Sequence, residues 1–306
     1  MKKTSRILSL ALALLLALTL TAATALAAQA EPTILTLTDM LGRELSFTKP
    51  VERIVVLQPA DAEILYAIGA GDLLVGRGEY ANYPAQVLEL PSVQSGFETN
   101  FEQIVALEPD VVVMTMMSQR EEDSKKLEDA GITTVISNAQ SIQGVYEAIA
   151  LMGKLTGKTE EAAALVDSMR ASFDEIRQKA QGKTGGSIYF EVSPLAYGLW
   201  TAGTATFMDE IAGMLGLTNA FHDLEGWQSV SEEQVISRDP DYIVTTAMYF
   251  GEGLKPVEEV LARPNWSGLK AVKNQNVFNS DSDEITRPGP RLVDAAQALY
   301  EFVYGK

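Results

Sequence analysis

The chain has 306 residues, with 41 acidic against 24 basic side chains, a formal net charge of −17 at pH 7 and no cysteine. The acidic balance argues against nucleic acid or an anionic membrane surface as a partner. The lack of cysteine excludes disulfides, a thiolate metal site and a cysteine nucleophile. The length is sufficient for two domains.

The first thirty residues have the layout of a secretory signal peptide. Lys2 and Lys3 precede an apolar stretch over residues 7–18, which is shorter than the ~20 residues that span a bilayer. Small residues then predict cleavage after Ala27 or Ala30. We expect an exported protein without stable membrane insertion. Because no cysteine is present to accept a lipid, we expect it to be free in a periplasm rather than lipid-anchored.

The next part of the chain alternates short apolar runs with helical patterns. It opens with a strand–turn–strand pattern over residues 34–47. Buried strands are then predicted at 53–57, 73–76, 111–113 and 133–136, and helices at 61–69, 100–107, 120–130 and 141–156. Strands that alternate with helices predict a mostly parallel sheet covered on both faces.

Residues 158–181 break this alternation with one long helical segment, whose apolar residues recur near the 3.6-residue period. The strand–helix alternation restarts at 187–190 and continues to the end of the chain. We therefore predict a signal peptide over 1–30, an α/β lobe over 31–157, a connecting helix over 158–181 and a second α/β lobe over 182–306.

An internal repeat supports two equivalent lobes. Residues 102–113 align without gaps on residues 233–244, with identical Glu-Gln and Pro-Asp pairs and an identical final Val. Each copy predicts a helix, a Pro-Asp turn and a strand. Self-similarity of this kind indicates repeated structural units. Two α/β lobes joined by one helix leave a cleft between them, and ligands commonly bind at such domain interfaces.

The order and spacing of several short motifs resemble the family of ABC-transporter binding proteins for ferric siderophores, haem and cobalamin. The motifs extend over essentially all of the chain after the signal peptide and comprise residues 39–44, 53–55, 63–72, 83–84, 101–110, 233–234 and 287–291. The resemblance implies two Rossmann-like lobes joined by a single long helix, a ligand cleft between them, and limited hinge motion. It also implies capture by an ABC permease dimer with its ATPase subunits. We expect a monomer.

Glu102 and Glu233 occupy the same position of the repeat, at the start of a helix in each lobe. In the family that the chain resembles, acidic residues at these places form salt bridges with arginines of the permease. A carboxylate there is favoured by the helix dipole and can accept a bidentate arginine. The alternative is a local capping-box glutamate, and the two roles are compatible.

The ligand cleft is expected to be built from loops that follow the strands of both lobes. Aromatic and methionine side chains suit a large, partly apolar chelate, although ordinary packing is the alternative for each. Arg287 is expected either to anchor an oxygen of the chelate or to fix the loop before the last helix, and Tyr80 could ligate iron if the ligand is haem. The predicted ligand-binding residues are Pro59, Tyr80, Tyr83, Met116, Tyr197, Trp200, Trp227, Tyr249 and Arg287.

An enzyme is not expected. No G-x-S-x-G motif occurs, and His222 is the only histidine, so neither a nucleophile elbow with its partner nor a transition-metal site is indicated. We therefore predict no intrinsic cofactor and a metal chelate as the bound ligand. The resemblance favours a ferric siderophore delivered to an importer, with cobalamin or haem as the alternative ligand and a ligand sensor of the same fold as the alternative role. The sequence does not determine which chelate binds.

Overall fold

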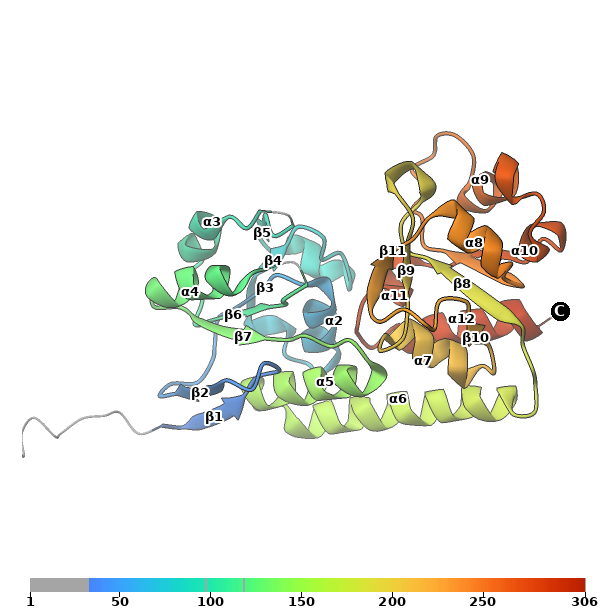
Figure 1. The fold of residues 1–306 in the computed structure, drawn as a ribbon. Helices are drawn as coiled ribbons and strands as arrows, with labels where there is room; N and C mark the ends of the chain where they lie inside the picture. Colours follow the sequence, from blue (N-terminus) through green and yellow to red (C-terminus); the bar gives the residue numbers. More distant parts are fainter. Residues whose placement is uncertain (1–32, 97, 118, 306) are drawn as a thin grey trace, which may run out of the picture. The chain divides into compact units, whose positions relative to one another are not determined.

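A computed structural model describes residues 33–305 except Phe97 and Ser118 (Figure 1). The predicted signal peptide and its two cleavage sites lie outside these residues. The chain divides into a small compact unit, which contains the segment up to Thr36 and Ser46–Pro50, and a large one with Leu37–Leu45 and Val51–Lys306. The large unit contains both major sheets. No helix within the described ranges is long and apolar enough to cross a membrane.

The opening hairpin is confirmed. Strands β1 (Leu35–Thr38) and β2 (Glu44–Phe47) form a two-stranded sheet. In the turn between them, the Asp39 carboxylate accepts hydrogen bonds from the amides of Leu41 and Arg43, both at 3.0 Å. Gly42 takes a positive φ of 79°, which a glycine adopts without steric cost.

The first major sheet is parallel throughout, with strand order β5-β4-β3-β6-β7. Strands β3 and β6 pair with each other inside the sheet, and all their residues are completely buried. Helices that cover both faces of the sheet explain why these strands are uninterrupted apolar runs. The chain adds strands to one side of β3 and then returns to add β6 on the other side. The strands are β3 (Ile54–Val56), β4 (Leu74–Gly78), β5 (Ser92–Val93), β6 (Val111–Met114) and β7 (Thr133–Ile136), and the helices are α2 (Pro59–Ala67), α3 (Phe101–Ala106), α4 (Glu121–Asp129) and α5 (Ile142–Thr156).

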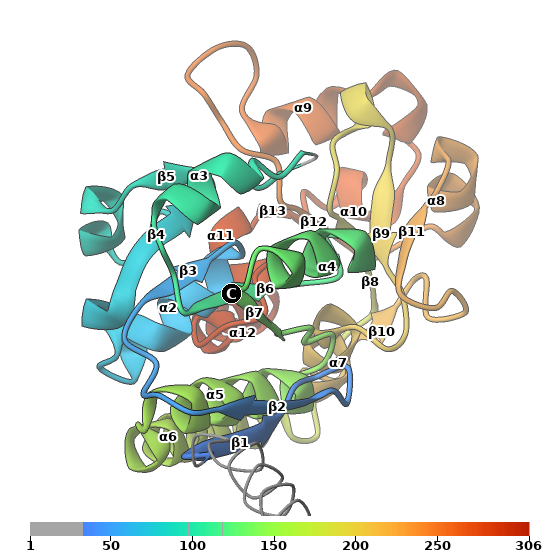
Figure 2. The same cartoon turned by 90° about the vertical axis from the view of Figure 1, so that its left-hand side faces the viewer.

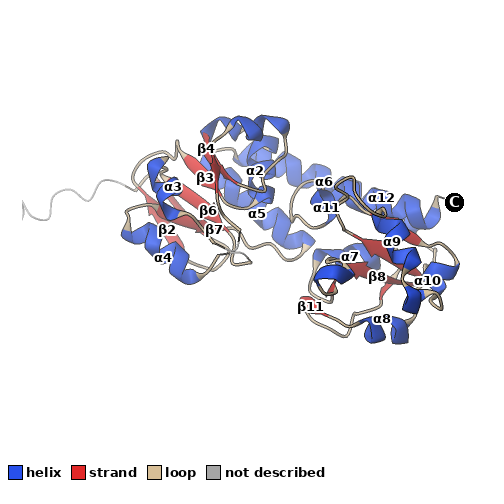
Figure 3. Cartoon of the chain, turned by 90° about the horizontal axis from the view of Figure 1, so that it is seen from above, coloured by secondary structure: helices blue, strands red, loops and turns tan. Residues whose placement is uncertain are grey.

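The second major sheet repeats this plan, with parallel strands in the order β10-β8-β12-β13. Here too the first strand, β8, lies inside the sheet. The chain adds β10 on one side of β8 and then crosses to add β12 and β13 on the other side, so the strand order reverses between β8 and β12. Figure 3 shows helices around the strands of both sheets. The strands are β8 (Ser187–Glu191), β10 (Thr218–Asn219), β12 (Tyr242–Thr245) and β13 (Val277–Asn279), and the helices are α7 (Phe207–Met214), α8 (Glu232–Arg238), α9 (Pro256–Ala262), α10 (Lys270–Lys273), α11 (Ser282–Ile285) and α12 (Leu292–Tyr304).

A small antiparallel sheet in the second lobe was not predicted. It pairs β9 (Trp200–Ala202) with β11 (Trp227–Ser229), in a register that places Trp227 opposite Ala202. Strands of three residues are too short to produce a recognisable alternation of polar and apolar side chains.

A 22-residue helix, α6 (Thr159–Ala180), occupies the segment for which the sequence predicts one long helix. It begins two residues after Gly157, which ends α5 in the left-handed conformation with a φ of 71°. Helix α6 packs beside α5, as Figure 2 also shows, and contacts α7 and α12 of the second lobe. Its buried side chains include Met169, Phe173 and Ile176. The fold class is confirmed as α/β with two parallel-sheet lobes, while the predicted lobe boundaries stay a prediction.

Candidate functional site

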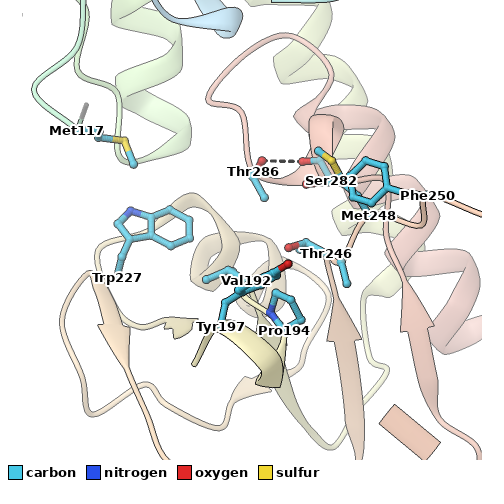
Figure 4. A pocket seen from close by; sticks show the side chains of 11 residues that line it. Met117, Val192, Pro194, Tyr197, Trp227, Thr246, Met248, Phe250, Ser282 and Thr286 are labelled. Carbon is cyan, nitrogen blue, oxygen red and sulfur yellow. Dashed lines mark hydrogen bonds between the residues drawn. The ribbon is translucent and has the colours of Figure 1, made fainter. Parts of the chain in front are cut away.

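A pocket of about 460 Å³ lies at the carboxyl end of the second sheet, where the strand order reverses between β8 and β12 (Figure 4). Open parallel sheets bind ligands at this switch point, because the loops diverge there and leave a crevice. One lining residue comes from the first lobe and the others come from the second. They are Met117, Val192, Pro194, Tyr197, Trp227, Thr246, Ala247, Met248, Phe250, Ser282 and Thr286.

The lining is mainly apolar and aromatic, with a few hydroxyl groups. Tyr197 and Phe250 are 85% and 86% exposed, so both present nearly whole rings to a ligand. Trp227 is held by its indole Nε1, which donates to the Gln140 side chain at 3.1 Å. The Thr286 hydroxyl donates to the Ser282 carbonyl at 2.6 Å (Figure 4). The surface can therefore stack against a large flat or folded ligand and hydrogen-bond to its polar edge.

A buried ion pair lies beneath this surface. Glu191, the last residue of β8, accepts two hydrogen bonds from the Arg263 guanidinium at 2.6 and 3.0 Å, and both side chains are at most 3% exposed. Burial disfavours the Arg263 charge, but the bonds to Glu191 and Glu259 outweigh it and raise the pKa of the guanidinium. Thr245 also donates to Glu191, at 3.1 Å. Because Val192 and Thr246 are the next residues along the chain, this network fixes the floor of the pocket.

Arg263→Lys should lower the free energy of unfolding by about 2 kcal/mol, because lysine cannot make both bonds to the buried Glu191 carboxylate. Urea unfolding measures the change. The matched control is Arg238→Lys. Arg238 also forms a bidentate ion pair, with Asp223, but the side chain of Asp223 is 60% exposed. We expect the control to lose clearly less stability than Arg263→Lys, because solvent screens an exposed ion pair. Equal losses of unfolding free energy in the two variants would show that burial does not strengthen the contribution of the Arg263–Glu191 pair to stability.

Of the nine predicted ligand-binding residues, the structure brings Tyr197 and Trp227 into this pocket. The other seven lie outside its lining: Pro59, Tyr80, Tyr83, Met116, Trp200, Tyr249 and Arg287. Met116 packs against the core of the first lobe instead, while its neighbour Met117 lines the pocket. The ligand-binding roles themselves stay predictions.

Two further lining residues, Met117 and Phe250, are immediate neighbours of the predicted residues Met116 and Tyr249. The lining residues that were not predicted are Val192, Pro194, Thr246, Ala247, Met248, Ser282 and Thr286. Most of them follow directly on β8, β12 or β13. The rule that ligands bind beyond the carboxyl ends of parallel strands points to these loops. Small and hydroxyl side chains within the loops provide no further signal, because such residues are common in any loop.

Arg287 and its neighbour Arg291 are engaged with Glu63 of α2. Arg287 Nη1 lies 3.0 Å from Glu63 Oε1 and its Nη2 lies 2.6 Å from Asp283, while Arg291 donates to both Glu63 oxygens at 2.9 and 2.8 Å. The Arg291 guanidinium also lies 4.4 Å above the Tyr83 ring. We call Glu63, Tyr83, Asp283, Arg287 and Arg291 the Glu63 cluster. These contacts favour the alternative in which Arg287 has a structural role.

The family model "Periplasmic binding protein" matches residues 54–284, which is most of the chain. The chain is a member of this family. A Bacillus subtilis relative described as an uncharacterized ABC transporter substrate-binding lipoprotein is 34% identical over 276 residues, covering 88% of this chain and 85% of the relative. A vitamin B12-binding protein of Vibrio cholerae is 28% identical over 260 residues, covering 83% of this chain and 90% of that protein.

A solved structure agrees with this assignment. A possible iron-binding, periplasmic solute-binding protein from Staphylococcus epidermidis superposes on this chain with a TM-score of 0.71 and 30% sequence identity. The match covers 84% of this chain and 100% of that one. The family resemblance inferred from the motifs is thereby confirmed, and family members are transport proteins rather than enzymes.

Glu102 and Glu233 of this binding protein are exposed and occupy the second position of α3 and α8. Neither is the capping residue: Asn100 caps α3, and Ser231 caps α8 in a capping box with Gln234. A hydrogen bond from Ser231 and backbone hydrogen bonding lower the pKa of Glu233. In both lobes the helix runs back toward the start of the next parallel strand, so its first turn lies at the edge where the strands end. Their docking role stays a prediction.

No group of three or more His, Cys, Asp or Glu side chains is arranged to hold a metal ion in the parts of this binding protein that the structure describes. His222, the single histidine, lies 3.1 Å from Asp209.

Proposed function

We propose that this chain is the substrate-binding component of an ABC importer and captures an iron chelate, a ferric siderophore, for delivery to a permease dimer with its ATPase subunits. The observation that carries the proposal is the pocket at the β8–β12 switch point, lined by exposed aromatic rings within the family's fold. The name of the Staphylococcus epidermidis protein, a possible iron-binding protein, favours iron as the metal.

Cobalamin is the second candidate ligand. It is favoured by the Vibrio cholerae relative, whose name is vitamin B12-binding protein. A corrinoid is a large ring with amide side chains, so it also suits a surface of aromatic rings and hydroxyl groups. Haem is a third candidate, and Tyr80, which is 62% exposed, is its candidate iron ligand.

The proposal places the protein outside the cytoplasm, exported by residues 1–30 and not anchored by lipid. The Bacillus subtilis relative is named a lipoprotein, whereas the present sequence contains no cysteine that could accept a lipid. Fractionation of expressing cells tests this location. A protein that stays with the membrane until detergent is added would contradict it.

Native mass spectrometry of the purified protein against ferric siderophores, cobalamin and haemin tests the ligand class. We expect one stoichiometric complex with one of these chelates. Tyr197→Ala should weaken that complex roughly tenfold, because a mostly exposed ring that stacks on the ligand would be lost.

Tyr80→Ala is the matched control, since Tyr80 is also an exposed tyrosine but lies outside the pocket lining. A larger loss in the Tyr80 variant than in the Tyr197 variant would move the site away from the pocket and favour haem. If no chelate in the panel binds, the proposed function is wrong.

A further inference from the structure

The pocket lining carries no charge among the described residues. Its eleven side chains are aliphatic, aromatic, thioether or hydroxyl groups, as Figure 4 shows. Ser118, beside the lining residue Met117, and Phe97 lie outside the description, but neither type of side chain ionises at neutral pH. An anionic group on a ligand would therefore find no cation on this surface.

The arginines nearest in sequence to the lining are already neutralised. Arg287 follows the lining residue Thr286, but its guanidinium is bound by the carboxylates of Glu63 and Asp283 and is only 11% exposed. Arg291 is 15% exposed and donates twice to Glu63, whose side chain is 2% exposed. Freeing either arginine for a ligand would leave the buried Glu63 carboxylate short of partners, which is costly.

The surroundings of these arginines are acidic. Asp281, Asp283 and Glu284 lie at the start of α11, the helix that also provides the lining residue Ser282. Together with Glu63 they place four carboxylates around two guanidiniums. Glu191, below the floor, has its charge compensated by Arg263 and adds no free cation. The local field therefore disfavours a ligand with negative charge.

From this charge arrangement we infer that the pocket selects metal chelates without net negative charge, and that Glu63 sets this selectivity by holding Arg287 and Arg291 away from the ligand. The inference rests on the proposed function and narrows its ligand class. The favoured ligands are neutral ferric hydroxamates and neutral corrinoids, whose amide and hydroxyl groups can pair with Thr246, Ser282 and Tyr197. Ferric catecholates and haem carry anionic oxygens that would lose their hydration without gaining a cation.

The test compares dissociation constants of the full chain for two matched pairs of chelates. One pair is a neutral ferric trihydroxamate and an anionic ferric tris-catecholate, and the other is cyanocobalamin and haemin. Tryptophan fluorescence quenching provides the readout, with native mass spectrometry for stoichiometry. In at least one pair the neutral member should bind more than about tenfold more tightly, the ratio expected from one uncompensated charge near a protein surface.

Glu63→Gln then tests the origin of the selectivity. Removal of this carboxylate charge takes away the shared ion-pair partner of Arg287 and Arg291 and leaves Arg287 paired with Asp283, so the surroundings of the pocket become less negative by one charge. The affinity for the anionic member should then rise about tenfold while that for the neutral member changes less. The matched control is Glu128→Gln, which releases Arg43 from an ion pair with an exposed glutamate in the first lobe and should leave both affinities unchanged. If the Glu63 variant does not fold, the comparison of the two pairs on the unaltered protein still decides the inference.

The outcomes separate the inference from the proposed function. If neither neutral member binds at least about tenfold more tightly than its anionic partner, the inference is overturned and the binding function stays intact. Binding of none of the four chelates would overturn both. An unchanged preference in a folded Glu63→Gln variant would overturn the role assigned to Glu63.

Discussion

Arginine at both Glu102 and Glu233 should abolish ligand uptake in cells that express the importer, while the affinity of the purified protein for its ligand stays within about twofold. Both carboxylates are exposed, stand outside the pocket lining, and make no ion pair within the described parts of the chain. They are therefore available to arginines of a partner, and a reversed charge would replace attraction by repulsion. The measurements are uptake of labelled ligand and binding by the purified variant.

The structure offers a matched control for this charge reversal. Glu122 and Glu160 are also exposed and also occupy the second position of a helix, α4 and α6 respectively. Glu122→Arg with Glu160→Arg makes the same change in net charge at equivalent helix positions, so a general effect of charge on expression or export would appear there too. Normal uptake by the Glu102/Glu233 double variant would contradict the docking role. Equal losses of uptake in both double variants would show that the effect comes from the change in net charge and not from the positions of Glu102 and Glu233.

The internal repeat explains why the helix positions of Glu102 and Glu233 could be predicted from the sequence, whereas most residues of the pocket lining could not. A helix, a Pro-Asp turn and a strand are local features, and they place Glu102 and Glu233 at the same helix position without reference to the rest of the chain. The parallel strands were predicted for the same reason, because buried Val and Ile runs between helices are themselves local.

The arrangement of the Glu63 cluster depends instead on tertiary structure. Glu63 and Arg287 are 224 residues apart, and nothing in the local sequence of either residue indicates the other. A sequence argument therefore leaves Arg287 available for a ligand, whereas the folded chain pairs it with carboxylates. Exposure has the same limitation. Tyr80 and Tyr249 lie in loops and Tyr197 ends a short 3-10 helix, and all three rings are exposed, but only the fold determines that Tyr197 lines the pocket.

Burial of Asp61 leads to the second large expected effect, a loss of stability as the pH rises. Asp61 lies in the first turn of α2, is completely buried, and neither of its carboxylate oxygens has a hydrogen-bond partner of normal geometry among the described residues. Burial raises the pKa of this carboxyl from 3.8 to about 7, and the nearby Ser137 hydroxyl offsets only part of that rise. The folded protein therefore keeps the proton over a pH range in which the unfolded chain has lost it.

The sign of the effect follows from this difference in proton binding. The stabilisation is complete below pH 4, decreases as the pH rises toward 7, and is lost above 7, with a total of about 4 kcal/mol. Asp61→Asn removes the titration while it keeps the shape of the side chain. Relative to the unaltered protein, this variant should gain about 3 kcal/mol in free energy of unfolding between pH 5 and pH 8, measured by urea unfolding at both pH values.

Asp39→Asn is the matched control, because Asp39 is also a buried aspartate but its carboxylate is fully hydrogen-bonded. It accepts from the amides of Leu41, Arg43 and Ile136 and from the Arg43 guanidinium at distances of 2.8–3.2 Å. An amide cannot replace the carboxylate in all these bonds, so this variant should lose about 1–3 kcal/mol at both pH values. A pH-independent difference between Asp61→Asn and the unaltered protein would mean that Asp61 is ionised in the fold, with a cation or ordered water beside it that compensates its burial.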